Sequence, residues 1–193
     1  MARQPARVLE PADVTRLLQH ITSLRNRHRN TTMILLSFKA GLRACEIAGL
    51  TWPMTLRSDG KVSAHLSIAR GIAKYGSGRQ VPMHRELQRA LAQHHRAQGR
   101  PGEGPVIASA RGGHMSARGI VNWFRKSYDE LGLVGCSSHS GRRTFITLSA
   151  RAIGKVGGSL RDVQELAGHR ALSTTERYIV GDREAQRKLV QLL

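Results

Sequence analysis

The spacing of apolar residues departs from the helical period in one segment of the sequence, and this departure limits the folds that the chain can adopt. Most segments repeat apolar residues at helical spacing, as ADVTRLLQHI does over residues 12–21. Over residues 61–83 the spacing becomes two, because KVSAHLSIA places Leu66 and Ile68 on one side of an extended chain. The turn residues YGSG follow, and RQVPM then resumes the extended pattern. We therefore predict an α+β fold that is mostly α-helical and contains a small antiparallel β-sheet.

Predicted helices account for the rest of the pattern. Pro11 is suited to the first turn of the first helix. Thr31 and Thr32 are expected to cap the apolar segment MILLSFKAG, which we predict to be the central helix of the core. His94 and His95 lie in a polar helical stretch, so we expect them on a solvated face. The other predicted helices cover residues 42–50, 84–97, 117–132, 140–154, 159–168 and 174–193.

The length of the chain favours one domain. Its 193 residues are enough for a sizeable core, and no Pro-, Gly- or Ser-rich linker divides them. No apolar run is long enough to span a bilayer, so we expect no membrane partner. The N-terminal MARQPARVLEPADV lacks the apolar stretch of a signal peptide, which favours a cytoplasmic location.

Basic residues far outnumber acidic ones. The sequence has 31 Lys and Arg against 13 Asp and Glu, which gives a formal net charge of +18. Such an excess opposes compaction unless a polyanion neutralises it, so DNA or RNA is the favoured partner and an anionic membrane surface a weaker one. Aromatic residues make up only 4% of the chain and no RNA-recognition motif is present, which disfavours an RNA-binding protein.

Three clusters of charged residues could carry chemistry or could be ordinary surface features. In GLRACEIAGL, Arg43 and Glu46 are three residues apart and could simply pair across one helical turn. In AKYGSGRQVP, Lys74 stands at the shoulder of the predicted hairpin, where lysines commonly protect sheet edges. In SHSGRRTF, His139 and Arg142 share one face at a helix start, as they would at any basic helix end.

A fourth cluster lies near the C-terminus, in GHRALSTTERY. Gly168 is suited to end the preceding helix, which leaves His169 just beyond that helix and free to point into a cleft. Ser173 and Glu176 have capping-box spacing, so we expect a new helix to begin there with Tyr178 in its first turns. Taken alone, Tyr178 is more simply interpreted as a partly buried aromatic residue of the core.

In sequence order, the four motifs are GLRxxEIxxL, KxGxGRxVP, HxxR and LxGHxxxxTTxxY. Together they resemble the catalytic domain of tyrosine recombinases, the phage integrase family, from about Val8 to the end of the chain. The resemblance implies that family's fold and a site-specific DNA recombinase that acts in integration, excision or inversion. We therefore expect residues 1–193 to be a single catalytic domain, without the N-terminal DNA-binding domain common in the family.

The resemblance assigns four residues to the scissile phosphate. Arg43 and Arg142 would clamp its non-bridging oxygens, Glu46 would support Arg43, and His169 would donate a hydrogen bond to the phosphate. The chemistry agrees, because attack on a phosphodiester adds negative charge to those oxygens and guanidinium groups offer planar, bidentate donors that stay protonated. Neither a metal ion nor another cofactor is then required.

The resemblance assigns three further residues to bond breaking. Tyr178 would be the nucleophile that forms a 3′-phosphotyrosine, His139 would accept its proton, and Lys74 would protonate the departing 5′ oxygen. Because another 5′ hydroxyl could reverse the step, cutting and rejoining would be one reaction run in two directions. A type IB topoisomerase shares this chemistry, but the motifs fit a recombinase better.

The expected partners are double-stranded DNA and further copies of the chain, assembled as a tetramer on DNA within the nucleoid. The C-terminal REAQRKLVQLL could exchange between such copies or could pack on its own domain, and the sequence favours neither. The alternative function is that of a non-catalytic DNA-binding relative. It would require the loss of at least one of the six catalytic groups, and all six are present.

Overall fold

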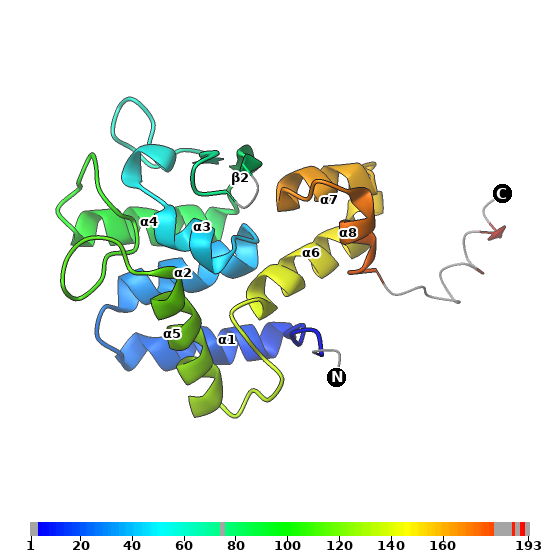
Figure 1. Ribbon diagram of the computed structural model, residues 1–193, viewed down its shortest axis with the longest axis horizontal. Coiled ribbons are helices and arrows are strands. Elements are labelled where there is room, and N and C mark those ends of the chain that lie inside the picture. Colours follow the sequence, from blue (N-terminus) through cyan, green and yellow to red (C-terminus); the bar gives the residue numbers. More distant parts are fainter. Residues whose placement is uncertain (1–3, 74–75, 180–186, 188–189, 192–193) are drawn as a thin grey trace.

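The computed structural model describes residues 4–73, 76–179, 187 and 190–191, and it confirms the predicted α+β class (Figure 1). The described α-helices and β-strands are α1 (Pro11–His20), α2 (Arg27–Lys39), α3 (Ala44–Gly49), β1 (His65–Ile68), β2 (Arg79–Pro82), α4 (Arg85–Ala97), α5 (Ala117–Glu130), α6 (Ser140–Ala152), α7 (Leu160–Ala167) and α8 (Leu172–Glu176). Helices α1 to α5 and the sheet form the larger part of the molecule, and α6 leads from it to α7 and α8.

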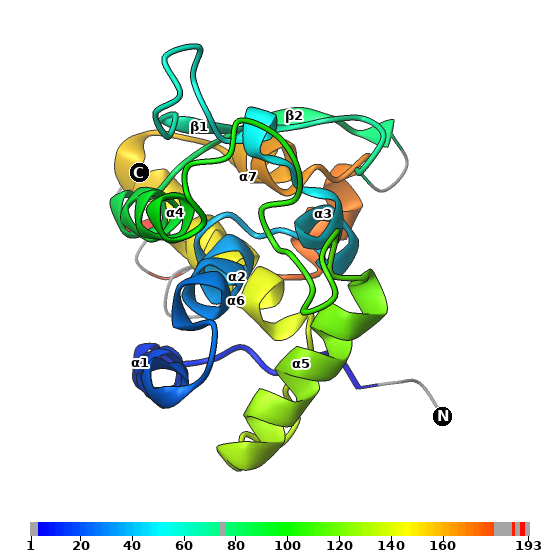
Figure 2. The ribbon, with the colours of Figure 1, turned by 90° about the vertical axis from the view of Figure 1, so that its left-hand side faces the viewer.

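Strands β1 and β2 form the antiparallel sheet that the period of two predicted. The register pairs Leu66 with Val81 and Ile68 with Arg79. Leu66, Ile68 and Val81 are buried in the main core, so one face of the sheet packs against the helices. Figure 2 shows the sheet lying along one side of the helices, with both of its strands at the edge of the molecule.

Helix α2 is the central helix of the core, as predicted, and it contacts α3, α4 and α6. All residues from 32 to 38 are buried, which is typical of a helix that is enclosed on every side. The predicted caps were wrong, because the helix begins at Arg27 after Asn26, whose φ is +62°. Thr32 therefore lies inside the helix, where its hydroxyl donates a hydrogen bond to the carbonyl of His28 (2.8 Å).

The solvated face predicted for His94 and His95 was also wrong. Both side chains are buried at the end of α4, with their rings against Trp52. His94 Nε2 donates to the carbonyl of Val106 (2.7 Å), and His95 Nε2 donates to the carbonyl of Pro101 (2.9 Å). The loop after α4 folds back over the helix and brings these acceptors, so the two rings are buried with their hydrogen bonds satisfied.

The C-terminal helices follow the sequence prediction only in part. Gly168 ends α7 in the left-handed conformation (φ +63°), as predicted. Helix α8 begins after Ala171 rather than at Ser173, and Tyr178 follows the helix instead of lying in its first turns. Most of the predicted helix beyond Tyr178, with most of REAQRKLVQLL, lies outside the described residues. Within the described part of the chain, no helix is long and apolar enough to cross a membrane.

Candidate active site

The centre of the candidate site is a buried carboxylate at the start of α3. Oε2 of Glu46 accepts a hydrogen bond from the backbone N–H of Arg43 (2.9 Å), and Oε1 accepts one from Nη1 of Arg43 (3.2 Å). The predicted pairing of these two residues is therefore confirmed, and it caps α3. Burial would raise the pKa of Glu46, but hydrogen bonds and charges from Arg79 and Arg43 outweigh burial and hold that pKa below its ordinary value.

Arg79 on β2 is the second partner of Glu46, and the sequence analysis did not single it out. Its Nη1 donates to Oε1 of Glu46 (2.9 Å), its Nη2 to Oε2 (3.2 Å) and its Nε to the carbonyl of Leu166 (2.9 Å). One signal could have revealed it. Arg79 stands opposite the buried Ile68 and on the same face as Val81, so an arginine occupies a core-facing position that requires a buried partner.

Arg142 lies in the first turn of α6 and is buried. Its Nη1 donates to the carbonyl of Gly41 and its Nη2 to the carbonyl of Ala167, both at 2.6 Å. Gly41 has a φ of +64°, and an added Cβ would lie 2.4 Å from Phe145, so only glycine suits this turn. Burial, and after it the charge of Arg43, lowers the pKa of Arg142 to about 10, so Arg142 remains charged at neutral pH.

His169 joins Arg142 to the segment that contains the predicted nucleophile. Its Nε2 lies 2.9 Å from Nη2 of Arg142, and its Nδ1 lies 2.9 Å from Oγ1 of Thr175. Because a guanidinium only donates, Nε2 is the acceptor and Nδ1 carries the proton that it donates to Thr175. Burial, followed by the positive charges of Arg142 and Arg43, lowers the pKa of His169 to about 4. His169 is therefore neutral at physiological pH.

Tyr178 lies against this network and is half-buried. Its ring stacks on His169, with 5.7 Å between ring centroids and 21° between ring planes. The guanidinium carbon of Arg143 lies 5.8 Å from the centroid of the tyrosine ring. The structure thus brings Tyr178 and His169 together, next to the buried arginine of α6.

The structure describes only one of the two remaining predicted residues, His139 and Lys74. His139 is the N-cap residue of α6, is exposed, and borders a cavity of about 580 Å³ together with Ser137 and Ser138. Lys74 lies outside the described residues. Ser77, which follows it in the turn between the strands, donates from its hydroxyl to the carbonyl of Gly168 (3.4 Å), so the end of this turn borders α7.

A cavity of about 570 Å³ opens beside the site, between the turn that precedes β2 and the end of α7. Gly78, Arg79, Gly168 and His169 are among its lining residues. Among the described residues, no group of three or more His, Cys, Asp or Glu side chains could hold a metal ion. The side chains that the structure gathers at this site carry guanidinium, imidazole, carboxylate and phenol groups.

Residues 7–184 match the model of the phage integrase family. The chain belongs to this family. Its relatives within the family include tyrosine recombinase XerC of Nitrobacter winogradskyi, which is 34% identical over 163 residues, or 81% of this chain and 47% of the relative. XerC of Xylella fastidiosa is 27% identical over 177 residues, or 91% of this chain and 56% of the relative. The chain thus spans about half the length of these relatives.

Solved structures of an integrase and of a recombinase share the fold. The Tn1549 transposon integrase in complex with circular intermediate DNA superposes with a TM-score of 0.75 at 20% identity, covering 100% of this chain and 69% of that chain. XerA recombinase superposes with a TM-score of 0.71 at 19% identity, covering 100% of this chain and 65% of that chain. The tyrosine recombinase fold that the motifs implied is therefore confirmed.

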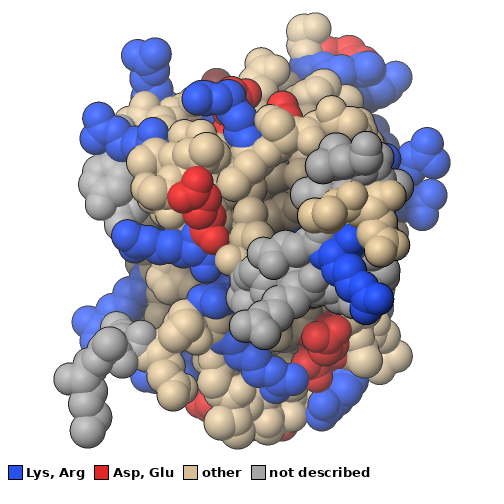
Figure 3. Space-filling model, turned by 90° about the vertical axis from the view of Figure 1, so that its right-hand side faces the viewer, with Lys and Arg blue, Asp and Glu red and all other residues tan. Residues whose placement is uncertain are grey.

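The surface of this integrase family member is rich in basic side chains, as its formal net charge of +18 requires. Figure 3 shows the face on the side of α7 and α8, where Lys and Arg side chains lie all around the rim and Asp and Glu side chains are fewer. This excess of positive charge favours the approach of a polyanion.

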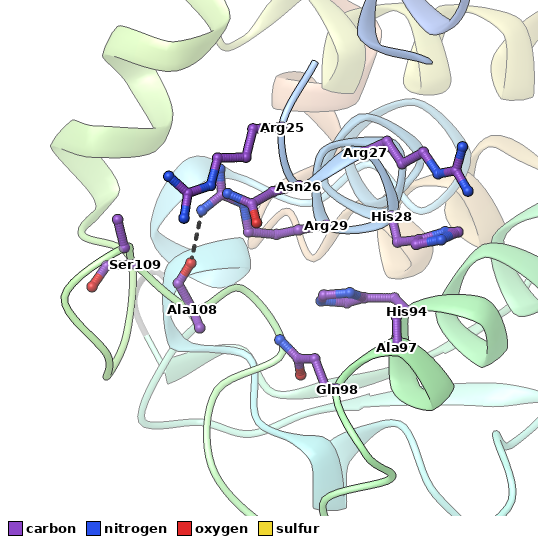
Figure 4. Close-up of a pocket in the computed structure, with 11 residues that line it drawn as sticks. Arg25, Asn26, Arg27, His28, Arg29, His94, Ala97, Gln98, Ala108 and Ser109 are labelled. Carbon is purple, nitrogen blue, oxygen red and sulfur yellow. Dashed lines mark hydrogen bonds between the residues drawn. The ribbon is translucent and has the colours of Figure 1, made fainter. Parts of the chain in front are cut away.

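A second basic region of this family member lies at the other end of α2. A pocket of about 500 Å³ lies between the start of α2, the end of α4 and the loop at Ala108, and none of the described residues that line it is Asp or Glu (Figure 4). Its lining includes Arg25, Arg27 and Arg29, and Arg29 donates to the carbonyl of Ala108 (3.0 Å). Because α2 has 13 residues, this basic pocket is roughly 20 Å from the end of α2 that leads to Arg43.

Proposed function

We propose that this chain carries the active site of a site-specific DNA recombinase, which cuts and rejoins double-stranded DNA through a 3′-phosphotyrosine. The observation that carries the proposal is the arginine cluster, which we define as the guanidinium groups of Arg43, Arg79 and Arg142 with the carboxylate of Glu46. The three cations are largely buried around one anion, so two positive charges have no buried counter-charge among the residues that the structure describes. A phosphodiester group supplies the charge that this cluster lacks.

In the reaction that we propose, the hydroxyl oxygen of Tyr178 attacks the phosphorus and the bond from phosphorus to the 5′ oxygen breaks. His139 accepts the phenolic proton, and Lys74 supplies a proton to the departing 5′ oxygen. Negative charge grows on the non-bridging oxygens in the transition state, where Arg43 and Arg142 stabilise it with donors that are already in place. The reverse reaction, with another 5′ hydroxyl as nucleophile, rejoins the strands.

His169 has a positioning role in this proposal. In the structure its Nε2 accepts a hydrogen bond from Arg142, so it holds the guanidinium in place and stacks on Tyr178 at the same time. The hydrogen bond to phosphate that the family resemblance implied requires the tautomer with the proton on Nε2. That tautomer becomes available if phosphate replaces His169 as the partner of Arg142.

Three further points of the proposal concern the whole protein. The relatives named tyrosine recombinase and the integrase structure with DNA support double-stranded DNA as the partner. We propose that copies of the chain assemble on that DNA as a tetramer and that residues 1–193 act as one catalytic domain. We propose that they act in the cytoplasm, on the nucleoid.

Covalent trapping on DNA tests the proposed function. Labelled DNA from the flanks of the gene is mixed with the protein, quenched with SDS and examined for a protein-linked band. We expect the band with the unmodified chain and with Tyr128→Phe, a matched control because Tyr128 is buried in α5 and its hydroxyl has no partner among the described residues. We expect no band with Tyr178→Phe, whose DNA affinity should stay within a few fold. A band of full intensity with Tyr178→Phe contradicts the assignment.

A further inference from the structure

We propose that Arg79 is a positioning residue for the reaction, which acts by occupying Glu46 so that Arg43 remains available to the phosphate. This inference rests on the proposed function, because it concerns the same phosphate. If Arg79 only stabilised the fold through an ion pair, its replacement would not act through Arg43. The proposal predicts that replacing Arg79 slows the reaction because Arg43 becomes less available to the phosphate. The evidence is the division of the hydrogen bonds around the carboxylate of Glu46.

The carboxylate of Glu46 is saturated by the bonds that it accepts. An ionised carboxylate offers about four lone-pair positions. Arg79 fills two of them as a bidentate pair at 2.9 and 3.2 Å, and the backbone N–H and Nη1 of Arg43 fill the other two. Among the described residues, Glu46 therefore holds the guanidinium of Arg43 by a single hydrogen bond of 3.2 Å. The other donors of that guanidinium are left for a further acceptor.

Removal of Arg79 would change both the charge and the geometry of this arrangement. Two lone-pair positions of a fully buried carboxylate would lose their donors, and the guanidinium of Arg43 is the adjacent group able to fill them. A bidentate pair between Arg43 and Glu46 would withdraw donors from the phosphate. The anionic carboxylate, without its bidentate partner, would also repel the anionic phosphate.

Arg79 has a second anchor, on the opposite side of the site. Its Nε donates to the carbonyl of Leu166, and its side chain passes so close to Gly168 that an added Cβ there would lie 2.9 Å from Nη1. The neighbouring carbonyl of Ala167 holds Arg142. One side chain thus joins Glu46 on α3 to the end of α7, which sets the separation of the two arginines that would bind the phosphate.

A lysine cannot reproduce these contacts, because its ammonium is a point charge and lacks the planar fork that reaches two carboxylate oxygens and a carbonyl together. Arg79→Lys therefore preserves the charge and removes the geometry. The matched control is Arg57→Lys, since Arg57 also pairs through both its Nε and Nη2 with a carboxylate, that of Asp59, but on the exposed surface.

The test is a double-mutant cycle on single-turnover cleavage at saturating DNA, with Arg79→Lys, Glu46→Gln and the double variant. We expect Arg79→Lys to slow cleavage about tenfold or more while the Kd for DNA changes less than about twofold, and Arg57→Lys to change neither. We expect the double variant to be no slower than the slower single variant. An unchanged cleavage rate for Arg79→Lys overturns the proposal. So does a double variant whose rate reduction equals the product of the reductions in the two single variants.

A second measurement needs no catalysis and separates this proposal from the proposed function. The guanidinium signals of Arg43 are recorded by NMR in the protein without DNA. We expect them to shift in Arg79→Lys and to stay in place in Arg57→Lys, and unchanged signals in Arg79→Lys overturn the proposal. If Arg79→Lys does not fold, Arg79→Gln replaces it, with the same expected shift and the same contrary result. If the unmodified chain forms no covalent adduct, the proposed function fails, and the NMR result still decides the role of Arg79.

Discussion

The two ends of α2 present arginines in opposite settings. At its C-terminal end, the arginine cluster is largely buried, and its guanidinium groups are fixed by a carboxylate and by backbone carbonyls. At its N-terminal end, Arg25 and Arg27 are exposed and line a pocket whose described residues include no Asp or Glu. Buried and oriented arginines can act on one particular phosphate, whereas exposed ones contribute affinity that depends little on geometry.

The largest effect should come from the buried end. Arg142→Ala removes the guanidinium of the arginine cluster that donates to two backbone carbonyls at 2.6 Å. We expect cleavage to slow by about a hundredfold or more, as for the loss of one oxyanion donor. The measurement is single-turnover cleavage of labelled DNA at saturation, with circular dichroism to confirm folding. A rate equal to that of the unmodified chain would remove the distinction between the two ends.

A smaller effect should appear in the pH dependence of stability. The folded protein lowers the pKa of His169 to about 4, below the ordinary value of roughly 6.5, so the native state binds fewer protons than the unfolded state between those values. The stabilisation is complete above pH ~6.5 and is lost as the pH falls towards 4. We expect the free energy of unfolding to fall by up to about 3 kcal/mol from this group over that range.

Urea unfolding of the unmodified chain and of His169→Asn, between pH 7 and 4.5, measures this contribution. The buried His94 also has a lowered pKa, so the difference between the two proteins, rather than either curve alone, reports His169. We expect the unmodified chain to lose more stability than His169→Asn as the pH falls. Parallel curves would show that His169 is not held neutral by its surroundings.

The smallest effect should come from the exposed end. The double variant Arg25→Ala, Arg27→Ala removes two charges from the basic pocket but leaves the arginine cluster intact. We expect DNA binding to weaken by a few fold and the cleavage rate at saturating DNA to stay unchanged. The slope of log Kd against log salt concentration should fall by about 0.9 for each phosphate that the variant no longer neutralises. A fall in the cleavage rate as large as the one for Arg142→Ala would contradict the contrast.

Features that depend on neighbours in sequence were predictable. The alternation around Leu66 gave the hairpin, the spacing of Arg43 and Glu46 gave their ion pair, and Gly168 marked the end of α7. Each rests on backbone geometry or on side chains less than one helical turn apart. His169 and Tyr178 are separated by one short helix, and their place in one site was predicted from the family resemblance rather than from local spacing.

Features that depend on distant acceptors were not predictable in the same way. His94 and His95 are buried because carbonyls of a later loop accept their hydrogen bonds, and nothing in the polar stretch around them records those acceptors. The start of α8 was misplaced because a capping-box pattern at Ser173 is only a local preference, which tertiary packing overrides. Arg79 escaped notice because its partners, Glu46 and Leu166, lie far from it in sequence.

The central claim is that the arginine cluster acts on the charge of the scissile phosphate. After the cleavage site is mapped, the most direct measurement compares the unmodified chain with Arg142→Ala on DNA that carries either phosphate or uncharged methylphosphonate at that position. We predict that Arg142→Ala cleaves the phosphate substrate at least about a hundredfold more slowly than the unmodified chain does. On methylphosphonate we predict that its rate is reduced less than about tenfold, because the charge that Arg142 stabilises is gone. An equal deficit on both substrates would contradict the claim.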